Sequence, residues 1–154
     1  MGERQFVVFR LEKEEYAIDI MNVKEIGPYE LTTRVPNSPS FITGVVNYRG
    51  EVIPIIDLKK KFALEETNSQ EEKRVIVIGL DEKQIGFVVD EASETVHFDE
   101  TEIEPPPEII IDKTRRYITG VGKKDSRLII IIDLAKVLSK DEQMKIKKLD
   151  LEDA

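Results

Sequence analysis

An internal repeat constrains this 154-residue chain more than any other feature of its sequence. With an offset of 76 residues, the segment from Phe41 to Val45 aligns with the segment from Tyr117 to Val121, and four of the five positions are identical. The alignment continues without a gap to a second set of identities: Ile53, Ile55, Ile56, Asp57 and Leu58 fall on Ile129, Ile131, Ile132, Asp133 and Leu134. Hairpins of unrelated β proteins also look alike, because branched residues flank their turns. An ungapped block that ends in Asp-Leu exceeds what hairpin chemistry demands, so the sequence predicts two related subdomains.

Short apolar runs separated by turn residues fill most of the chain. The pattern is typical of paired β-strands, and the runs are Phe6–Phe9, Tyr16–Ile20, Gly44–Tyr48, Val52–Ile56, Val75–Ile78, Ile85–Asp90, Thr95–Phe98, Tyr117–Val121 and Leu128–Ile132. No long helices alternate with them, which argues against a parallel α/β fold. We therefore expect a mainly β chain with two small closed barrels of about five strands each, since closure removes exposed strand edges. The two barrels would share a hydrophobic core.

The strand pattern is interrupted in two segments of the sequence. Residues 65–73 are polar and show no apolar periodicity, so we place the boundary between the subdomains there. From Asp133 to Ala154 the apolar residues switch to helical spacing, which predicts one short C-terminal helix. We assign residues 139–154 to this helix and a tail.

Charge and composition restrict the class of partner. The formal net charge is −8 and the chain has no cysteine. The negative charge disfavours nucleic acid and anionic lipid, which reward clustered lysine and arginine. The longest apolar runs are far shorter than the ~20 residues of a membrane helix, and the N-terminus lacks a secretory signal pattern. We expect a cytoplasmic chain that binds proteins and does not insert into a membrane.

The sequence offers little for catalysis. His97 is the single histidine, and it alternates with Val96 and Phe98 on a predicted strand, where we expect it to face solvent. No phosphate-binding loop and no metal-protease motif is present, so we predict no cofactor and no metal site. Asp57 ends a strand as the phosphoacceptor of a receiver domain does, and an enzyme that uses Asp57 with Glu51 is a further alternative. A receiver also needs a second acidic cluster and alternating helices, which this chain lacks. Asp57, Asp90 and Asp133 all follow apolar runs, which favours a role as caps or turn formers.

The segment from Phe41 to Leu58, FITGVVNYRGEVIPIIDL, resembles the signature of the CheW family of chemotaxis coupling proteins. The resemblance extends from about Gln5 to Leu138, which we take as one CheW-like domain over residues 5–138. It implies two SH3-like five-stranded barrels around a shared core. It also implies a non-catalytic adaptor that binds the regulatory domain of the histidine kinase CheA and the cytoplasmic tip of a methyl-accepting chemotaxis receptor. The length of the chain leaves no room for kinase domains or a fused receiver, which points to a stand-alone coupler.

The resemblance also implies contact residues. Val23, Glu25 and Ile26 match positions linked to kinase binding, whereas Gly44 and Arg49 match positions linked to receptor binding. Several alternatives stay open at the level of the sequence: Val23 and Ile26 also suit a hydrophobic core, Gly44 also suits close packing within a strand pair, and Arg49 also suits a solvated turn. The repeat separates two of these residues, because Gly44 recurs as Gly120 but Arg49 aligns with Asp125.

Overall fold

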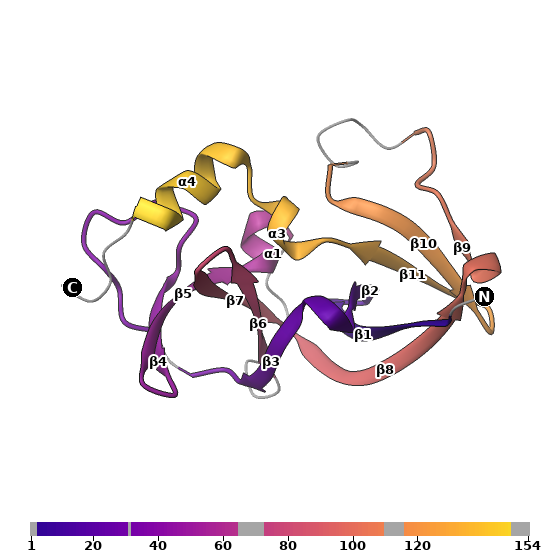
Figure 1. The fold of residues 1–154 in the computed structure, drawn as a ribbon, viewed down its shortest axis with the longest axis horizontal. Helices are drawn as coiled ribbons and strands as arrows, with labels where there is room; N and C mark the ends of the chain where they lie inside the picture. Colours follow the sequence, from indigo (N-terminus) through magenta and orange to yellow (C-terminus); the bar gives the residue numbers. More distant parts are fainter. Residues whose placement is uncertain (1–2, 31, 65–72, 110–115, 149–154) are drawn as a thin grey trace.

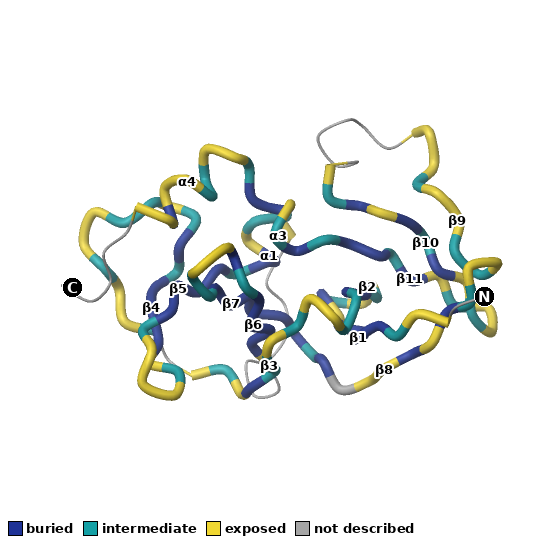
Figure 2. The backbone as a smooth tube through the Cα atoms, in the orientation of Figure 1, coloured by how far each residue is buried: buried dark blue, intermediate teal, exposed yellow. Residues whose placement is uncertain are grey.

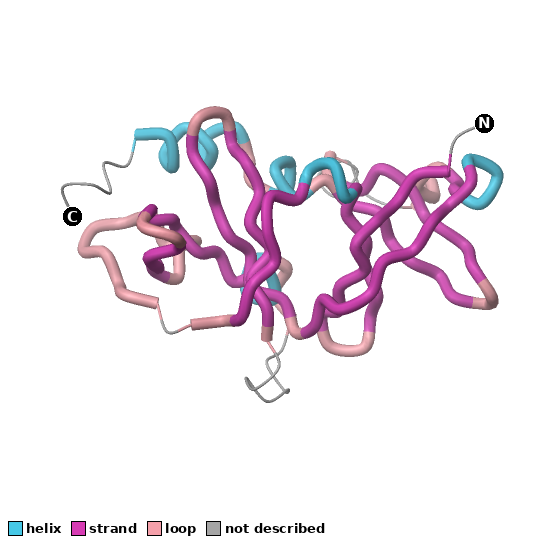
Figure 3. The backbone as a smooth tube through the Cα atoms, turned by 60° about the horizontal axis from the view of Figure 1, so that its bottom comes forward, coloured by secondary structure: helices cyan, strands magenta, loops and turns pink. Residues whose placement is uncertain are grey.

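A computed structural model describes residues 3–30, 32–64, 73–109 and 116–148. The chain is mainly β, as predicted, and its strands form two sheets that lie side by side along the longest axis of the molecule (Figures 1 and 3). We call the five-stranded sheet, of order β3-β6-β7-β5-β4, the first subdomain, and the six-stranded sheet, of order β8-β1-β2-β11-β10-β9, the second subdomain. The strands of the first are β3 (Val23–Pro28), β4 (Gly44–Tyr48), β5 (Glu51–Asp57), β6 (Arg74–Leu80) and β7 (Lys83–Val89). Those of the second are β1 (Glu3–Leu11), β2 (Glu14–Asp19), β8 (Glu91–Asp99), β9 (Ile103–Glu104), β10 (Ile118–Lys124) and β11 (Arg127–Ile132).

The two sheets have the same topology, but each contains a hairpin from the other half of the chain. The N-terminal β1–β2 hairpin belongs to the second subdomain, and the later β6–β7 hairpin belongs to the first. In the second subdomain the β1–β2 hairpin pairs in parallel with β11, and in the first the β6–β7 hairpin pairs in parallel with β5. The chain changes sheet at the short helix η1 (Ile20–Asn22) and again at Asp90. The predicted boundary at residues 65–73 therefore does not separate the sheets, because β5 and β6 on either side of it belong to the same one; residues 65–72 themselves lie outside the described residues.

Three hydrophobic clusters explain why whole strands are apolar rather than alternating. Successive strand residues point to opposite faces, so on β1 Phe6 and Val8 fill the interior of the second subdomain whereas Val7 and Phe9 enter a core between the subdomains. On β6, Val75 and Ile76 divide in the same way between the first subdomain and that shared core. Figure 2 shows the buried strands in both halves of the molecule. The shared core agrees with the prediction. In the described part of the chain no ladder joins the two edge strands of either sheet, so full barrel closure stays a prediction.

The sequence repeat corresponds to a repeated structure. The hairpins β4–β5 and β10–β11 each lead into a short helix, α1 (Leu58–Lys61) and α3 (Leu134–Val137). Asp57 caps α1 by accepting the Lys60 backbone N–H at 3.2 Å, and Asp133 caps α3 by accepting the Ala135 N–H at 3.1 Å. These contacts confirm the predicted role of the two aspartates as caps, and they give Asp57 a structural function that needs no phosphorylation.

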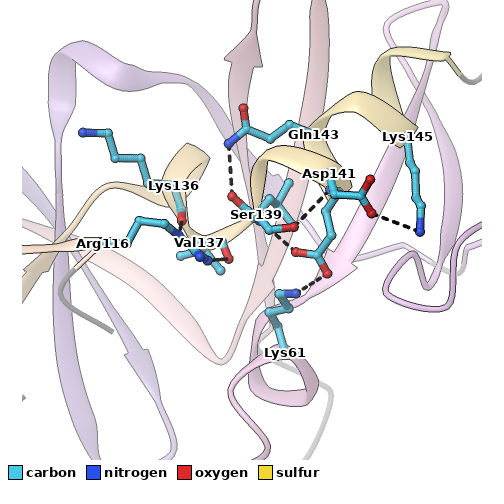
Figure 4. Close-up of polar contacts among 10 residues, drawn as sticks. Lys61, Arg116, Lys136, Val137, Ser139, Asp141, Gln143 and Lys145 are labelled. Carbon is cyan, nitrogen blue, oxygen red and sulfur yellow. Dashed lines mark hydrogen bonds and ion pairs between the residues drawn. The ribbon is translucent and has the colours of Figure 1, made fainter. Parts of the chain in front are cut away.

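The C-terminal segment forms two helices where one was predicted. After α3 the chain turns at Ser139 and begins α4 (Lys140–Lys148). Ser139 and Glu142 form a capping box: the Glu142 N–H donates to Ser139 Oγ at 3.1 Å, and the Ser139 N–H donates to Glu142 Oε1 at 2.9 Å. A Ser-x-x-Glu pattern is typical of the start of a helix, so the end of α3 and the start of α4 could have been predicted from the sequence. Glu142 also accepts a hydrogen bond from Lys61 of α1 at 2.5 Å, which ties α4 to the first subdomain (Figure 4).

The Glu142 contacts predict an acid-sensitive attachment of α4. Burial by itself would raise the pKa of Glu142, but the ion pair with Lys61 and the hydrogen bonds with Ser139 outweigh it and hold the pKa below its usual 4.5. A carboxyl with a lowered folded-state pKa contributes stability above its unfolded pKa and loses it as the pH falls through the folded one. In denaturant unfolding at a series of pH values, we expect wild-type stability to fall below pH 4.5 and Glu142→Gln to flatten that fall. An equal slope in the two proteins would contradict the assignment.

Candidate functional site

Val23 and Ile26 both face the shared core from β3, the edge strand of the first subdomain. The pairing of β3 with β6 shifts register between Val23 and Glu25, as at a β-bulge. The extra residue turns Val23 to the same side as Ile26, and both pack half-buried against the shared core. Each side chain is thus partly in the core and partly exposed, and a kinase contact by either residue stays a prediction.

A cleft of about 410 Å³ adjoins this strand. Met21 and Lys24 line it from one side and Ala135 at α3 from the other, so it lies between the two subdomains. Met21 is 86% exposed there. The cleft therefore borders Val23, one of the residues predicted to contact the kinase.

Arg49 occupies the tip of the β4–β5 hairpin in a strained backbone conformation. Its φ is 54° and that of Gly50 is 85°, which is the pair of positive angles that a type I′ turn requires. Asparagine and glycine favour such angles, whereas a long side chain in the left-handed region costs roughly 1–2 kcal/mol. Other turn residues of the chain, among them Asp81 (φ 56°) and Asp125 (φ 49°), have the same conformation, so the angle fixes the turn, and a function for Arg49 depends on what its side chain contacts.

The structure brings Arg49 together with Glu25, one residue from each of the two predicted contact sets. Arg49 Nε lies 2.9 Å from Glu25 Oε1 and 3.1 Å from Oε2. The side chains are 79% and 30% exposed. The pair uses only Nε, and Nη1 and Nη2 form no hydrogen bond or ion pair with any residue that the structure describes. Arg49 therefore presents two parallel donors to solvent, the geometry that binds a carboxylate or a pair of carbonyl oxygens.

Tyr48 lies beside this pair and bridges the two edge strands. A Cβ added to Gly27 of β3 would fall 1.5 Å from the Tyr48 hydroxyl oxygen, so the tyrosine occupies the space that a side chain at position 27 would need. Burial raises the pKa of Tyr48, and so do the negative charge of Glu25 and a hydrogen bond to it. We call this region the seam of the first subdomain. It consists of Tyr48 on β4 and Arg49 in the turn after it, which face Gly27 and Glu25 on β3.

Gly44 does not reach this seam and has a packing role. It is buried, and a Cβ there would lie 2.7 Å from both Thr32 Cβ and the Thr33 carbonyl oxygen. At the equivalent Gly120 a Cβ would lie 2.9 Å from Ile103 Cγ2 and 3.1 Å from the Glu104 carbonyl oxygen. Both glycines thus let the preceding segment cross tightly over the hairpin, which explains why they recur. A receptor contact by Gly44 stays a prediction.

We expect Gly44→Ala to lower the free energy of unfolding by about 1–3 kcal/mol, the usual cost of overpacking against backbone. Gly79→Ala is the matched control, since its Cβ would meet only the flexible Lys24 Cε at 3.2 Å. Urea denaturation of the two variants measures both values. Equal stability of the two would show that the Gly44 site can relax and would remove the packing explanation.

Lys59, Glu12 and Asp90 form a buried charged cluster that sequence reasoning missed. Lys59 is 2% exposed on α1, and its Nζ lies 3.0 Å from Glu12 Oε1 and 3.0 Å from Asp90 Oδ1. Asp90 Oδ2 in turn accepts the Glu12 backbone N–H at 2.6 Å. Because Glu12 is in the β1–β2 turn and Asp90 at the crossing from β7 to β8, the cluster joins the two subdomains. One signal was available, namely that Lys59 breaks the repeat by aligning with Ala135.

The remaining candidates from the sequence are His97, a metal site and a membrane helix. His97 is exposed on β8, as expected. Among the described residues no group of His, Asp and Glu side chains is placed to hold a metal ion. Within the same residues no helix has the length and apolar character needed to cross a bilayer.

Comparison with known proteins decides the family. The model of the CheW-like domain matches residues 5–142. The chain belongs to the CheW family. It is 40% identical over 139 residues to the chemotaxis protein CheW of Klebsiella aerogenes, covering 90% of this chain and 84% of that protein. It is 39% identical over 140 residues to CheW of Bacillus subtilis, covering 91% and 89%.

A solved structure supports the same assignment. The scaffolding protein TtCheW from Thermoanaerobacter tengcongensis superposes with a TM-score of 0.80 at 35% sequence identity, covering 92% of this chain and 96% of that one. The fold described above is therefore the CheW fold. Membership of this family supports an adaptor or scaffold role in chemotaxis.

Proposed function

We propose that this CheW-family chain is a non-catalytic adaptor that couples chemoreceptors to the histidine kinase CheA. The observation that carries the proposal is the Arg49–Glu25 pair, in which a strained turn presents two guanidinium donors outward at 79% side-chain exposure. A solvated turn would tolerate asparagine here at lower backbone cost. The family relationship supports the choice of the two proposed partners, the kinase regulatory domain and the cytoplasmic tip of a methyl-accepting chemotaxis receptor.

The proposed contact sets adjoin one another. Val23, Glu25 and Ile26 on β3 would contact the kinase, and Arg49 with the region of Gly44 would contact the receptor. Because Glu25 and Arg49 form one ion pair, the two partners would meet at a shared border. Each interface would be modest, near the low end of ~1,200 Å², and simultaneous binding would raise the effective concentration of kinase beside receptor. The adaptor would act in the cytoplasm, recruited to receptor arrays at the membrane.

Gel filtration tests the proposal. The chain is mixed with the CheA regulatory domain, with a peptide hairpin that carries the receptor tip, and with both. Co-elution with each partner, and of all three together, is the expected result. Elution of the chain alone in every mixture would refute the coupling role. In parallel, incubation with a small-molecule phosphodonor and magnesium is expected to leave Asp57 unmodified, and a phosphorylated Asp57 would revive the receiver alternative.

A further inference from the structure

The Arg49–Glu25 pair is too exposed to hold its own geometry. Ion pairs between solvent-exposed side chains contribute little, because water screens the charges and two long side chains must be ordered. Arg49 needs a fixed position if its free donors are to meet a partner without a further entropic cost. A third group must therefore restrain the pair.

Tyr48 is placed to do this. Its ring packs against the interior cluster of the first subdomain, and its hydroxyl lies over Gly27 on β3. Gly27 is two residues from Glu25 on the same strand, so a tyrosine that sits on one also borders the other. Glu25 is thus paired with Arg49 on the stretch of β3 that Tyr48 covers at Gly27, and the negative charge of Glu25 acts on the tyrosine by raising its pKa.

The repeat provides independent support for this arrangement. Tyr48 aligns with Lys124 at the same offset of 76 residues. Lys124 Nζ donates to the His97 carbonyl oxygen at 2.6 Å and lies 5.9 Å from the centroid of the Phe98 ring. His97 and Phe98 belong to β8, the edge strand that corresponds to β3. The last residue before the hairpin turn thus reaches the edge strand β3 or β8 in each subdomain, by a tyrosine from β4 in one and by a lysine from β10 in the other.

We propose that Tyr48 is a positioning residue for partner binding: it latches β4 onto Gly27 of β3 and holds Glu25 where it orients Arg49. The contact of Arg49 with a partner rests on the proposed function, whereas the latch itself does not. Only the first subdomain combines a latch with an arginine in the turn. The turn position that corresponds to Arg49 in the second subdomain is Asp125, an acidic residue that cannot offer the same donors.

The latch is tested without any partner by following Tyr48 ionisation in NMR, with a Tyr48→Phe spectrum to assign the signal. The wild-type pKa is expected above 10. Glu25→Gln is expected to lower it, because the Glu25 charge and hydrogen bond raise it. Arg49→Ala is expected to raise the Tyr48 pKa above the wild-type value, since the positive charge of the arginine lowers it. Glu30→Gln is the control, because the charge of Glu30 makes the weakest contribution to the Tyr48 pKa. A pKa that none of the Glu25 and Arg49 substitutions moves would overturn the latch.

A pair of glycine variants tests the same contact through stability. In the wild-type background Gly27→Ala is expected to lower the melting temperature, because the new methyl group displaces Tyr48. In a Tyr48→Leu background the same change is expected to cost little. Equal losses in the two backgrounds would show that Tyr48 does not occupy that space and would overturn the proposal.

Binding of the receptor hairpin separates positioning from a general structural effect. Tyr48→Phe is expected to weaken binding by about 3–10-fold, the range of one lost hydrogen bond. That loss is expected to vanish in an Arg49→Ala background, where no guanidinium remains to be oriented. A loss of the same size in both backgrounds would refute the positioning role. If the wild-type chain binds neither partner, the proposed function fails while the tyrosine titration still decides the latch.

Discussion

Replacing Lys59 with methionine is expected to lower the free energy of unfolding by about 3–5 kcal/mol, the usual cost of removing one partner from a buried ion pair. Methionine has nearly the shape of the lysine stem, so little packing is lost. The loss arises because the Asp90 carboxylate, with its side chain 8% exposed, keeps its charge but no longer faces the ammonium. Since the stability of a domain is typically only about 5–15 kcal/mol, this is the largest single effect that we predict for the fold.

Lys60→Met is the matched control for this variant. Lys60 is the next residue on α1, exposed to solvent, and its replacement is expected to change stability by no more than about 0.5 kcal/mol. The double variant Lys59→Met/Asp90→Asn is expected to lose less than Lys59→Met alone, because an amide can still accept the Glu12 N–H without carrying a charge. Guanidinium denaturation of the three proteins measures these differences. A Lys59→Met protein within 1 kcal/mol of wild type would show that the cluster does not hold the subdomains together.

The second large effect concerns binding. Arg49→Glu is expected to raise the Kd for the receptor hairpin at least about 30-fold, which corresponds to the ~2 kcal/mol that defines a binding hot spot. The substitution removes both outward donors and places a second carboxylate beside Glu25. The fold is expected to remain, because the pair is exposed and contributes little to stability. Fluorescence anisotropy with a labelled hairpin gives the affinity, and the melting temperature monitors the fold.

Two further variants show whether the effect comes from this position. Arg34→Glu makes the same charge change at another exposed residue of the first subdomain and is expected to leave the affinity unchanged. Glu25→Arg/Arg49→Glu restores an ion pair across the seam but presents the arginine from β3, and it is expected not to restore binding. An Arg49→Glu protein that binds both partners as the wild type does would remove Arg49 from the contact surface.

The repeat was the most informative part of the sequence, but it could not show which strands pair. Identity between the two hairpins and their Asp-Leu ends predicted that β4–β5 and β10–β11 are equivalent hairpins, each followed by an aspartate that acts as a cap or turn former. The exchange of the β1–β2 and β6–β7 hairpins was not predictable. An apolar run such as Phe6–Phe9 indicates that both faces of the strand are buried, but it does not indicate which strand pairs with it. The predicted boundary at residues 65–73 does not separate the two sheets for this reason, since polar composition alone does not indicate whether the flanking strands belong to one sheet or to two.

The candidate site was predictable residue by residue but not as an arrangement. The hairpin pattern placed Arg49 in a turn, and the family resemblance selected Glu25. Their ion pair depends on how far the first sheet curls, which brings β3 and β4 within side-chain reach from opposite ends of the strand order. The burial of Lys59 was not predictable for a related reason. A lysine in a short helix is normally expected to face solvent, and Lys59 is buried because the turn that carries Glu12, in the other subdomain, packs against it.

The coupling role is tested most directly by co-sedimentation with receptor-bearing membranes. Membranes that carry the receptor are mixed with CheA, with and without this chain, and then pelleted. The kinase is expected in the pellet when the wild-type chain is present, and in the supernatant when the chain is omitted or replaced by Arg49→Glu. Kinase that pellets equally with and without the wild-type chain, or that never pellets with it, would contradict the adaptor role.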